Sequence, residues 1–375
     1  MIKELARKIS EERILPVRAE LDEKEEFPWE IVKALAEADM FRVFVPEAYE
    51  GLGGGTMELC IVTEELSRVC SGVAVTYAAS ALGCITLMEY GTEEQKKKFL
   101  PAIASGEKLG AFAITEATAG SDSGNIKTTA LKVDGGYVLN GTKQFITNGG
   151  EAEIYTVIAL TDPSRGARGA SALLVEKGMD GFTFGKKEKK LGIRTSATRE
   201  LVFKNCFVPE ENLIGKPGLG FIQAMRLFDR SRPGIGAQAV GLCQGALEAA
   251  VEYTGQRVQF DQPLISMPVV QNMLADMSIL TEAARALVYA AARHVDSGAK
   301  NVTEESASAK VFASDAAMKV TVDAVQLCGG SGYMRDYPVE KMMRDAKILQ
   351  IYEGTNQVLR GAIAANLRKR KGRTA

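Results

Sequence analysis

The sequence has very little histidine, and its cysteines form no motif. His294 is the single histidine among 375 residues, and it lies in an alanine-rich stretch that we expect to be helical. One histidine cannot build a multi-histidine metal site, and it argues against a Ser-His-Asp enzyme. The six cysteines are scattered without a CxxC pair, which argues against a zinc site and a disulfide framework. We therefore expect no metal centre and a reduced, cytoplasmic protein.

The chain also lacks an excess of charge of either sign and, as we interpret it, an apolar run long enough to cross a bilayer. Its formal net charge is -1, which gives no support to nucleic-acid binding, because that function usually leaves a basic face. The amphipathic start, Met1–Lys8, is charged and has no signal-peptide core. We expect neither a nucleic-acid partner nor a membrane span.

What is present is an ordinary globular composition arranged in three parts. Hydrophobic residues make up 46% of the chain and charged residues 25%, enough for more than one core. Residues 1–110 show helical spacing, 111–216 show short alternating runs broken by turns, and 217–375 are helical again. We expect a mostly α protein with an N-terminal helical domain, a central antiparallel β-domain (a sandwich or a barrel) and a C-terminal four-helix bundle.

Local signals place individual elements. Apolar spacing on one face, low charge, and start and stop residues predict helices over residues 57–69, 72–90, 221–257, 268–296 and 303–329. The second of these is almost uncharged and should be buried on all sides. Pro233 should interrupt the third helix, since proline removes a backbone hydrogen bond, and Thr303 should cap the last. Asn140-Gly141 should form a hairpin turn.

Two stretches have both a functional and a plain interpretation. The glycine-rich residues 51–55 have the wrong spacing for a dinucleotide-binding loop, and no strand precedes them, so we expect a flexible connection. Lys186, Lys187, Lys189 and Lys190 form a basic cluster. It is compatible with a solvated loop and with a contact for an acidic cofactor or an electron-transfer partner.

The carboxylate of Glu353 is the leading candidate for a catalytic group. It lies between Tyr352 and Gly354 after an apolar run, and Thr355 or Asn356 is typical of the N-cap of a final helix. Apolar surroundings raise the pKa of a carboxylate, whereas a nearby helix N-terminus favours its charged form. This environment suits a general base, although the local sequence taken alone favours a solvated turn residue.

Three motifs together resemble the acyl-CoA dehydrogenase family, in the family's order and over nearly the whole chain. They are Ala111–Asp122, Lys143–Gly149 and Arg344–Gln357. The resemblance implies FAD-dependent α,β-dehydrogenation of an acyl-CoA thioester to the trans-2-enoyl-CoA, with electrons passed to an electron-transfer flavoprotein. It also implies a homo-oligomer, most simply a tetramer, whose subunits share the FAD sites.

The resemblance makes Glu353 the base that removes the α-proton. Some branches of the family place their base instead where this chain has Arg230. The enolate oxygen would be bound by the Glu353 backbone N–H and by a ribityl hydroxyl of FAD. The substrate positions would be Ser121, Asp229, Arg232, Tyr352 and Gly354. From the residues alone, Asp229 and Arg232 could instead be a helix-surface pair, and Ser121 could cap a turn.

The cofactor contacts follow from the same resemblance. Within one subunit they would be Phe112, Ile114, Thr115, Gly120, Ser121, Phe145 and Thr147. Phe145 would lie beside the isoalloxazine ring, the alternative being a strand core residue, and Thr147 near the hydride-accepting nitrogen. A neighbouring subunit's FAD would be reached by Arg257, Gln259, Phe260, Gln326, Gly330, Thr355 and Gln357.

Three positions depart from the family's pattern. Asp261 stands where many relatives have glycine, and Pro268 stands where many have a glutamine, which would remove an amide that contacts the flavin. Ala117 replaces a proline after Glu116, a change that we expect to alter only a loop.

The acyl group is the least defined part of the prediction. Candidates for the acyl end of the pocket are Val75, Tyr77, Ala78, Ala79 and Tyr352. Their sizes leave short, medium and cyclic groups open, and we favour short or medium straight chains. Two other functions also stay open. In an acyl-CoA oxidase of the same fold, air would rapidly oxidise the reduced flavin. A non-catalytic helical binding protein would lack FAD.

Overall fold

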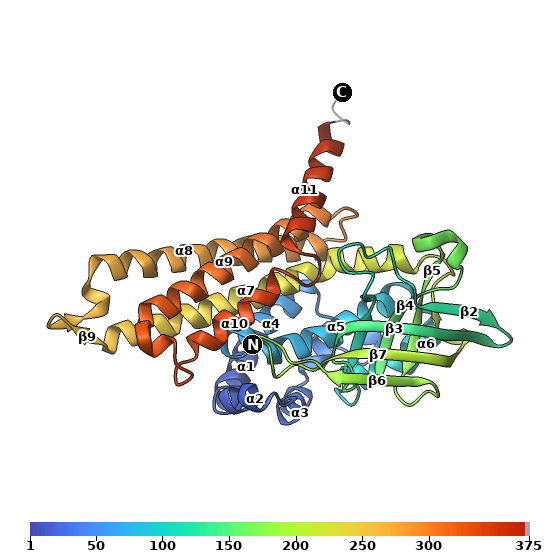
Figure 1. Cartoon of the computed structure of the whole chain (residues 1–375), viewed down its shortest axis with the longest axis horizontal. Helices are drawn as coiled ribbons and strands as arrows, with labels where there is room; N and C mark the ends of the chain where they lie inside the picture. The colour runs from blue at the N-terminus through green and yellow to red at the C-terminus, as the bar shows by residue number, and fades with distance from the viewer. Residues whose placement is uncertain (372–375) are drawn as a thin grey trace.

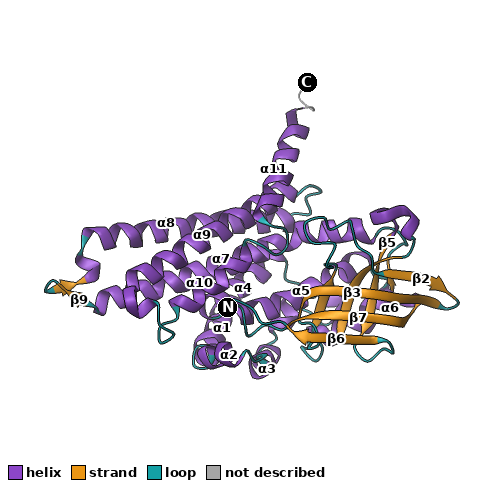
Figure 2. Ribbon diagram, in the orientation of Figure 1, coloured by secondary structure: helices purple, strands orange, loops and turns teal. Residues whose placement is uncertain are grey.

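The computed structural model describes residues 1–371 as one elongated molecule in three parts (Figure 1, Figure 2). The predicted fold class is confirmed, with helices first, a sheet in the middle and helices again at the end. Residues 372–375, the end of the predicted third domain, lie outside the described residues. The domain boundaries after residues 110 and 216 stay predictions.

The N-terminal part consists of helices. They are α1 (Ile2–Ile9), α2 (Arg18–Lys24), α3 (Trp29–Glu37), α4 (Thr56–Val69), α5 (Ser71–Tyr90) and α6 (Glu93–Ala104). Residues 51–55 form the connection that leads into α4. The helix predicted from residue 72 to residue 90 is α5, and most of its side chains are buried, as expected for a nearly uncharged helix.

The expectation that no apolar run could span a bilayer is wrong for α5. By length and composition, Ser71–Tyr90 is long and apolar enough to cross a membrane, and 78% of that apolar window is buried inside the structure. The helix packs on α4, on α7 (Gly220–Gln256) and on the first strand, so protein surrounds it on several sides. This burial accounts for its apolar composition.

The central part is built on one sheet. Its strands are β1 (Gly110–Ala113), β2 (Thr129–Val133), β3 (Gly136–Thr147), β4 (Ile154–Leu160), β5 (Ala170–Glu176), β6 (Phe182–Lys187), β7 (Thr198–Pro209) and β8 (Leu213–Ile214). They lie in the order β6-β7-β3-β2-β4-β5-β8, with β1 beside β4. The two strands β3 and β7 are the longest and carry one end of the sheet toward the helices (Figure 2).

The prediction of a purely antiparallel sheet is wrong at β4. This strand pairs in parallel with β1 over four residues and in parallel with β2 at Thr129 and Leu160. The long stretch between β1 and β4 gives the chain room for such a crossover. Asn140-Gly141 is not a hairpin turn either, since it lies inside β3 at an irregularity in the pairing with β7.

The C-terminal part contains α7, α8 (Pro268–Asp296), α9 (Thr303–Gly332), α10 (Val339–Leu349) and α11 (Asn356–Lys371). The predicted bundle is thus made of three long helices and the shorter α10. A two-stranded hairpin, β9 (Val258–Gln259) and β10 (Gln262–Pro263), joins α7 to α8. Figure 1 shows α7 running from the sheet to this hairpin at the far end of the bundle, while α11 projects away from the body.

Two local predictions in these helices are wrong. Pro233 does not interrupt α7, which continues for 37 residues because its long contacts with α4, α8 and α9 outweigh the one backbone N–H that proline lacks. Thr303 does not cap α9, because it is the first helical residue and its hydroxyl donates to Asp229 Oδ2 at 2.6 Å. The predicted end of α9 is visible as a non-helical Gly329, with φ 58°, shortly before the assigned end.

Candidate active site

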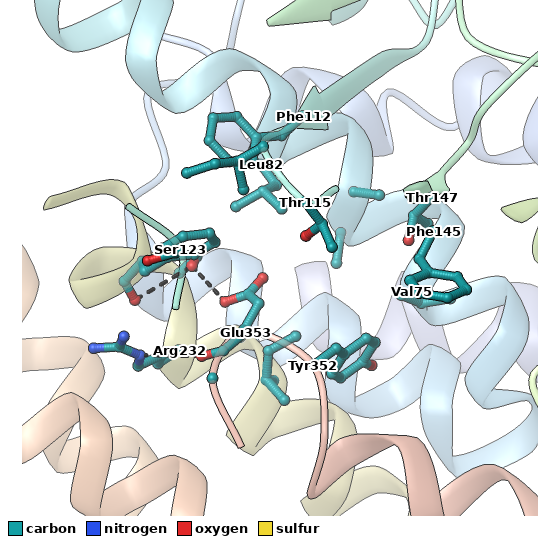
Figure 3. Close-up of a pocket in the computed structure, with 18 of the residues that line it drawn as sticks. Val75, Leu82, Phe112, Thr115, Ser123, Phe145, Thr147, Arg232, Tyr352 and Glu353 are labelled. Carbon is teal, nitrogen blue, oxygen red and sulfur yellow. Dashed lines mark hydrogen bonds between the residues drawn. The ribbon is translucent and has the colours of Figure 1, made fainter. Parts of the chain in front are cut away.

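A cavity of about 250 Å³ lies where the sheet meets the helices (Figure 3). Its wall comes from α4 and α5, from β1 and the loop after it, from the end of β3, from α7, from the turn after α10 and from the start of α11. The residues that line it are Leu59, Val75, Ala78, Ala79, Leu82, Ile85, Phe112, Ile114, Thr115, Gly120, Ser121, Ser123, Phe145, Ile146, Thr147, Met225, Phe228, Ser231, Arg232, Gly234, Ile235, Tyr352, Glu353, Gly354 and Val358.

Glu353 reaches this cavity from a strained turn. Its φ is 51°, and that of Gly354 is 97°, so two successive residues occupy conformations with positive φ. The carboxylate Oε2 accepts a hydrogen bond from Ser231 Oγ at 2.6 Å (Figure 3). Burial raises the pKa of Glu353 above its ordinary 4.5, while the Ser231 hydrogen bond and the charges of Arg232 and Lys310 oppose that shift. The solvated-turn interpretation is therefore wrong.

The neighbouring polar residues of α7 are held by ion pairs. Arg232 Nη1 lies 2.6 Å from Asp229 Oδ1, and Arg232 Nε donates to the Glu353 carbonyl oxygen at 3.3 Å. Because Arg232 is only 8% exposed and lines the cavity, it is not part of a surface pair. Asp229 lies behind it and also accepts from Thr303. At the alternative base position, Arg230 pairs with Glu89 at 2.6 Å.

The cofactor residues predicted within one subunit come together in the same cavity. Phe112, Ile114, Thr115, Gly120, Ser121, Phe145 and Thr147 all line it. Phe145 is 63% exposed with a φ of 57°, so it is not a strand core residue. Within the part of the chain that the structure describes, the hydroxyls of Thr115 and Thr147 have no protein hydrogen-bond partner. An open aromatic face beside two available hydroxyls fits a planar, polar-edged ring such as the flavin of FAD.

The residues predicted to reach a neighbouring FAD lie outside this cavity. Arg257, Gln259 and Phe260 are exposed on the β9–β10 hairpin, which lies far from the sheet in Figure 1. Gln326 and Gly330 are exposed near the end of α9, and Gln357 is exposed in the first turn of α11. Thr355 caps α11, because its Oγ1 accepts from the Val358 N–H at 3.2 Å. These cross-subunit contacts stay predictions.

The hairpin also explains one departure from the family's pattern. Phe260 and Asp261 have φ values of 52° and 61°, so they form the two-residue loop of a hairpin that needs positive φ at both positions. Aspartate is among the non-glycine residues that tolerate this conformation, which explains why it can replace glycine. Pro268 is the first residue of α8, where the absence of a backbone N–H costs little.

A buried ion pair beside the cavity escaped the sequence analysis. The ammonium of Lys143, a fully buried side chain, lies 2.6 Å from Glu116 Oε1 and donates to the Ile114 carbonyl oxygen at 3.0 Å. The same carboxylate accepts the backbone N–H groups of Lys127 and Thr128, so Glu116 closes the loop that carries Gly120 and Ser121. A lysine at an inward position of a strand was the available signal, because such a charge needs a partner.

The acyl-end candidates are only partly confirmed as cavity residues. Val75, Ala78, Ala79 and Tyr352 line the cavity, but Tyr77 is fully buried in the core and donates from its hydroxyl to the Met40 carbonyl oxygen at 3.1 Å. Tyr77 points away because a helix cannot present positions 75, 77, 78 and 79 on one face. The Tyr352 hydroxyl donates to Gln238 Oε1, which fixes the ring beside Glu353.

The basic cluster divides into two kinds of lysine. Lys187 donates to the Glu25 carbonyl oxygen, and Lys190 donates to the Ser196 carbonyl oxygen at 2.7 Å. Lys186 and Lys189 are exposed, but Lys186 lies in β6, so the solvated-loop interpretation holds only for Lys189. Its predicted contact with an acidic cofactor or partner stays a prediction.

Family comparisons agree with this geometry. Residues 1–107, 111–206 and 218–368 match the N-terminal, middle and C-terminal domains of acyl-CoA dehydrogenase, respectively. A short-chain-specific acyl-CoA dehydrogenase of Clostridium acetobutylicum is 46% identical, over 98% of this chain and 97% of its own length.

Solved structures resemble the chain over nearly its whole length. A chain from a structure of the electron-transferring flavoprotein of Acidaminococcus fermentans has a TM-score of 0.96 and 47% identity, covering 98% of this chain and 97% of that one. Butyryl-CoA dehydrogenase of Megasphaera elsdenii has a TM-score of 0.95 and 45% identity, with the same coverage of 98% and 97%. An acyl-CoA dehydrogenase of Bacillus anthracis in complex with FAD has a TM-score of 0.93 and 34% identity, covering 100% of this chain and 67% of that one.

The three matched domains and these identities define the class of protein, and the chain belongs to the acyl-CoA dehydrogenase family. The family predicted from the three sequence motifs is thereby confirmed. Within it, the chain is an acyl-CoA dehydrogenase, a flavoprotein oxidoreductase that acts on acyl-CoA thioesters.

Proposed function

We propose that Glu353 removes the α-proton of an acyl-CoA thioester while the β-hydride leaves to FAD, which yields the trans-2-enoyl-CoA. The observation that carries this proposal is the position of the Glu353 carboxylate, which lines one cavity together with Phe145, Thr115 and Thr147. FAD, when bound, supplies the hydride acceptor that no amino-acid side chain can provide.

The surroundings of Glu353 suit a base that takes a proton from carbon. An apolar cavity raises its pKa, so the carboxylate binds a proton more readily than an exposed one does. The Ser231 hydroxyl holds one oxygen, Oε2, which leaves the other free to face the substrate. In Figure 3 the carboxylate points from its turn into the space below Thr115, where the α-carbon would lie.

The turn also offers a donor for the enolate oxygen. Among the described residues, no protein acceptor binds the backbone N–H of Glu353. An aimed backbone N–H in a cavity shielded from water stabilises negative charge that develops on a thioester oxygen. This supports the assignment of that N–H to the enolate, and Arg232 holds the carbonyl oxygen of the same residue, which belongs to the next peptide group.

For the substrate we propose a short, straight-chain acyl-CoA. The cavity is about 250 Å³, and its helical wall includes the apolar side chains of Val75, Leu82, Ile85 and Met225. Similar proteins include a short-chain-specific dehydrogenase and butyryl-CoA dehydrogenase. A butyryl group is therefore the first substrate to test.

For the electron acceptor and the assembly we propose an electron-transfer flavoprotein and a homotetramer in the cytoplasm. The similarity to a chain in a structure of an electron-transferring flavoprotein supports the acceptor. The exposed hairpin with Arg257, Gln259 and Phe260 lies too far from its own cavity to serve it, which supports a role at a neighbouring subunit (Figure 1).

An anaerobic visible spectrum of the purified protein, followed by additions of straight-chain acyl-CoAs of increasing length, tests the proposed function. We expect flavin absorbance that bleaches fastest with butyryl-CoA or a close neighbour. Flavin that never bleaches with any acyl-CoA would contradict the proposed reaction, and a preference for long chains would contradict the proposed substrate. Rapid reoxidation by air would point to an oxidase instead of a dehydrogenase.

A further inference from the structure

The turn that carries Glu353 is tied to α9 by buried polar side chains. Lys310, Ser314 and Asp315 occupy successive turns of one face of α9, and all three contact residues of the segment 350–356. Within the described chain, Lys310 is the only lysine that contacts this turn from α9. Two helices therefore hold this turn. Side chains of α9 contact residues 350–356, and Ser231 and Arg232 of α7 contact Glu353.

Lys310 makes the central contact. Its side chain is fully buried, and its ammonium donates to the Gly354 carbonyl oxygen at 2.8 Å and to Asn356 Oδ1 at 2.9 Å. Burial lowers the pKa of Lys310 to about 8, and the negative charge of Glu353 opposes that shift. A buried lysine that only filled space could be replaced by an apolar side chain without a loss of stability. The two hydrogen bonds of Lys310 to the turn instead point to a specific role.

A second set of hydrogen bonds closes the turn around Asn356. Its Nδ2 donates to Ser314 Oγ at 2.9 Å and to Asp315 Oδ1 at 2.8 Å. The same Asp315 oxygen accepts from Gln350 Nε2 at 2.6 Å, so both ends of the turn bind one carboxylate. The Asn356 N–H also donates to the Gln350 carbonyl oxygen at 3.0 Å.

We propose that Lys310 is a positioning residue for the proposed base, which holds the Gly354 carbonyl and thereby keeps the strained Glu353-Gly354 pair aimed into the cavity. Glu353 and Gly354 both have positive φ. For a residue such as Glu353, this conformation persists only where the surrounding structure fixes it. The inference rests on the proposed function for the role of Glu353, but the contacts of Lys310 do not depend on it.

The test compares three substitutions of Lys310 with one matched control in the FAD-loaded enzyme. Lys310→Met removes both the charge and the donors, Lys310→Gln keeps a donor without the charge, and Lys310→Arg keeps both. The control is Lys319→Met on the same helix, because Lys319 is exposed and pairs with Asp323 one turn further on. FAD content and the thermal unfolding midpoint show whether each variant is folded.

The first readout is hydrogen–deuterium exchange of the peptide that covers residues 350–356, which needs no turnover. We expect at least about tenfold faster exchange in Lys310→Met and wild-type exchange in Lys319→Met, because only the first change frees the turn. The second readout is the rate of flavin bleaching by butyryl-CoA. We expect a loss of about 10- to 100-fold in Lys310→Met, with partial recovery in Lys310→Arg, since a small displacement of a catalytic group costs about 100-fold.

The third readout is the acid limb of the bleaching rate against pH. The charged and titratable groups that face Glu353 are Arg232 of α7, Lys310 of α9 and Tyr352 of its own turn, and Asp315 faces Lys310. The charge of Lys310 lowers the pKa of Glu353, so its removal should move the acid limb to higher pH. Lys310→Arg keeps the charge and should leave the limb in place, so a shift in Lys310→Met alone would be an effect that a purely structural role does not predict.

The outcomes separate this inference from the proposed function. If the wild type does not bleach, the proposed function fails, and the exchange experiment still decides the role of Lys310. If the wild type bleaches but Lys310→Met matches it in exchange, rate and pH profile, the inference is overturned. Should Lys310→Met not fold, Lys310→Gln takes its place, and wild-type exchange, rate and pH limb in that variant would equally overturn it.

Discussion

At Glu353, burial and hydrogen bonding act in opposite directions on one carboxylate. Desolvation in the cavity raises its pKa, and the 2.6 Å hydrogen bond from Ser231 stabilises its charged form. A base that is too strongly desolvated would stay protonated at neutral pH, and one that is fully solvated would be too weak. At Glu353 the Ser231 hydroxyl and the charges of Arg232 and Lys310 oppose the effect of burial.

We predict that Ser231→Ala moves the acid limb of the bleaching rate to higher pH, because the lost hydrogen bond favoured the charged carboxylate. The rate rises as pH increases through the pKa of Glu353, so a higher pKa shifts that rise upward. The measurement is the rate of anaerobic bleaching by butyryl-CoA against pH. Ser231→Thr keeps the hydroxyl and serves as the control, and an unshifted limb in Ser231→Ala would contradict the proposed contact.

At this scale the sequence predicts the residues of local motifs and misses partners that are distant in the chain. Glu353, Thr147 and Phe145 stand in recognisable motifs and reach the cavity. The partner of Asp229, Thr303, comes from another helix and was assigned to a cap instead. The buried pair of Glu116 and Lys143 joins a loop to a strand, so neither local pattern revealed it.

The elements are held in place by close helix packing, most clearly between α7 and α4. A Cβ added at Gly241 of α7 would lie 2.1 Å from the Glu64 carbonyl oxygen of α4, which is far closer than atoms can approach. Gly241 therefore allows the two backbones to touch. Since α7 also carries Ser231 and Arg232, this packing determines where the wall of the cavity lies.

We predict that Gly241→Ala lowers the free energy of unfolding by about 1–3 kcal/mol, because the extra methyl group must displace backbone atoms of α4. Gly255→Ala in the same helix is the matched control, since nothing lies within 4 Å of its added Cβ. There the better helix propensity of alanine should be neutral or stabilising by about 1 kcal/mol. Denaturant unfolding measures both, and equal stability of the two variants would contradict the packing argument.

The helices are predicted well because composition, apolar spacing and start and stop residues are local signals, as the bounds of α4, α5 and α8 show. The pairing of strands and the continuity of a helix through a proline are harder to predict from the sequence. Pro233 suggested a break, yet tertiary contacts along α7 keep the helix intact. Asn140-Gly141 suggested a turn, but the pairing of β3 with β7 absorbs it as an irregularity in a strand.

At the scale of the whole molecule, the β9–β10 hairpin lies at the end of the bundle that is far from the sheet (Figure 1), whereas the cavity lies where the sheet meets the helices. A cofactor larger than the cavity of about 250 Å³ must extend beyond it. The exposed arginine of the hairpin is suited to bind a pyrophosphate of a neighbouring subunit, because its fork can form two hydrogen bonds. Contacts between subunits are beyond what one chain's sequence pattern can establish.

We predict that the wild type has four times the 40.3 kDa mass of one chain by light scattering. Arg257→Ala should weaken FAD binding by about 10- to 100-fold, although its own cavity is unchanged, because a charged hydrogen bond is lost. Fluorescence titration with FAD measures the change. The exposed Arg293→Ala on α8 is the control. A monomeric wild type that binds FAD normally would contradict the shared site.

The central claim is that Glu353 is the base, and stopped-flow bleaching of Glu353→Gln by butyryl-CoA under anaerobic conditions tests it most directly. The amide keeps the size of the side chain and can still contact Ser231, but it cannot accept the α-proton. We predict normal FAD content, normal butyryl-CoA binding and a bleaching rate at least about 100-fold below the wild type. A Glu353→Gln variant that bleaches at the wild-type rate would show that another group removes the proton.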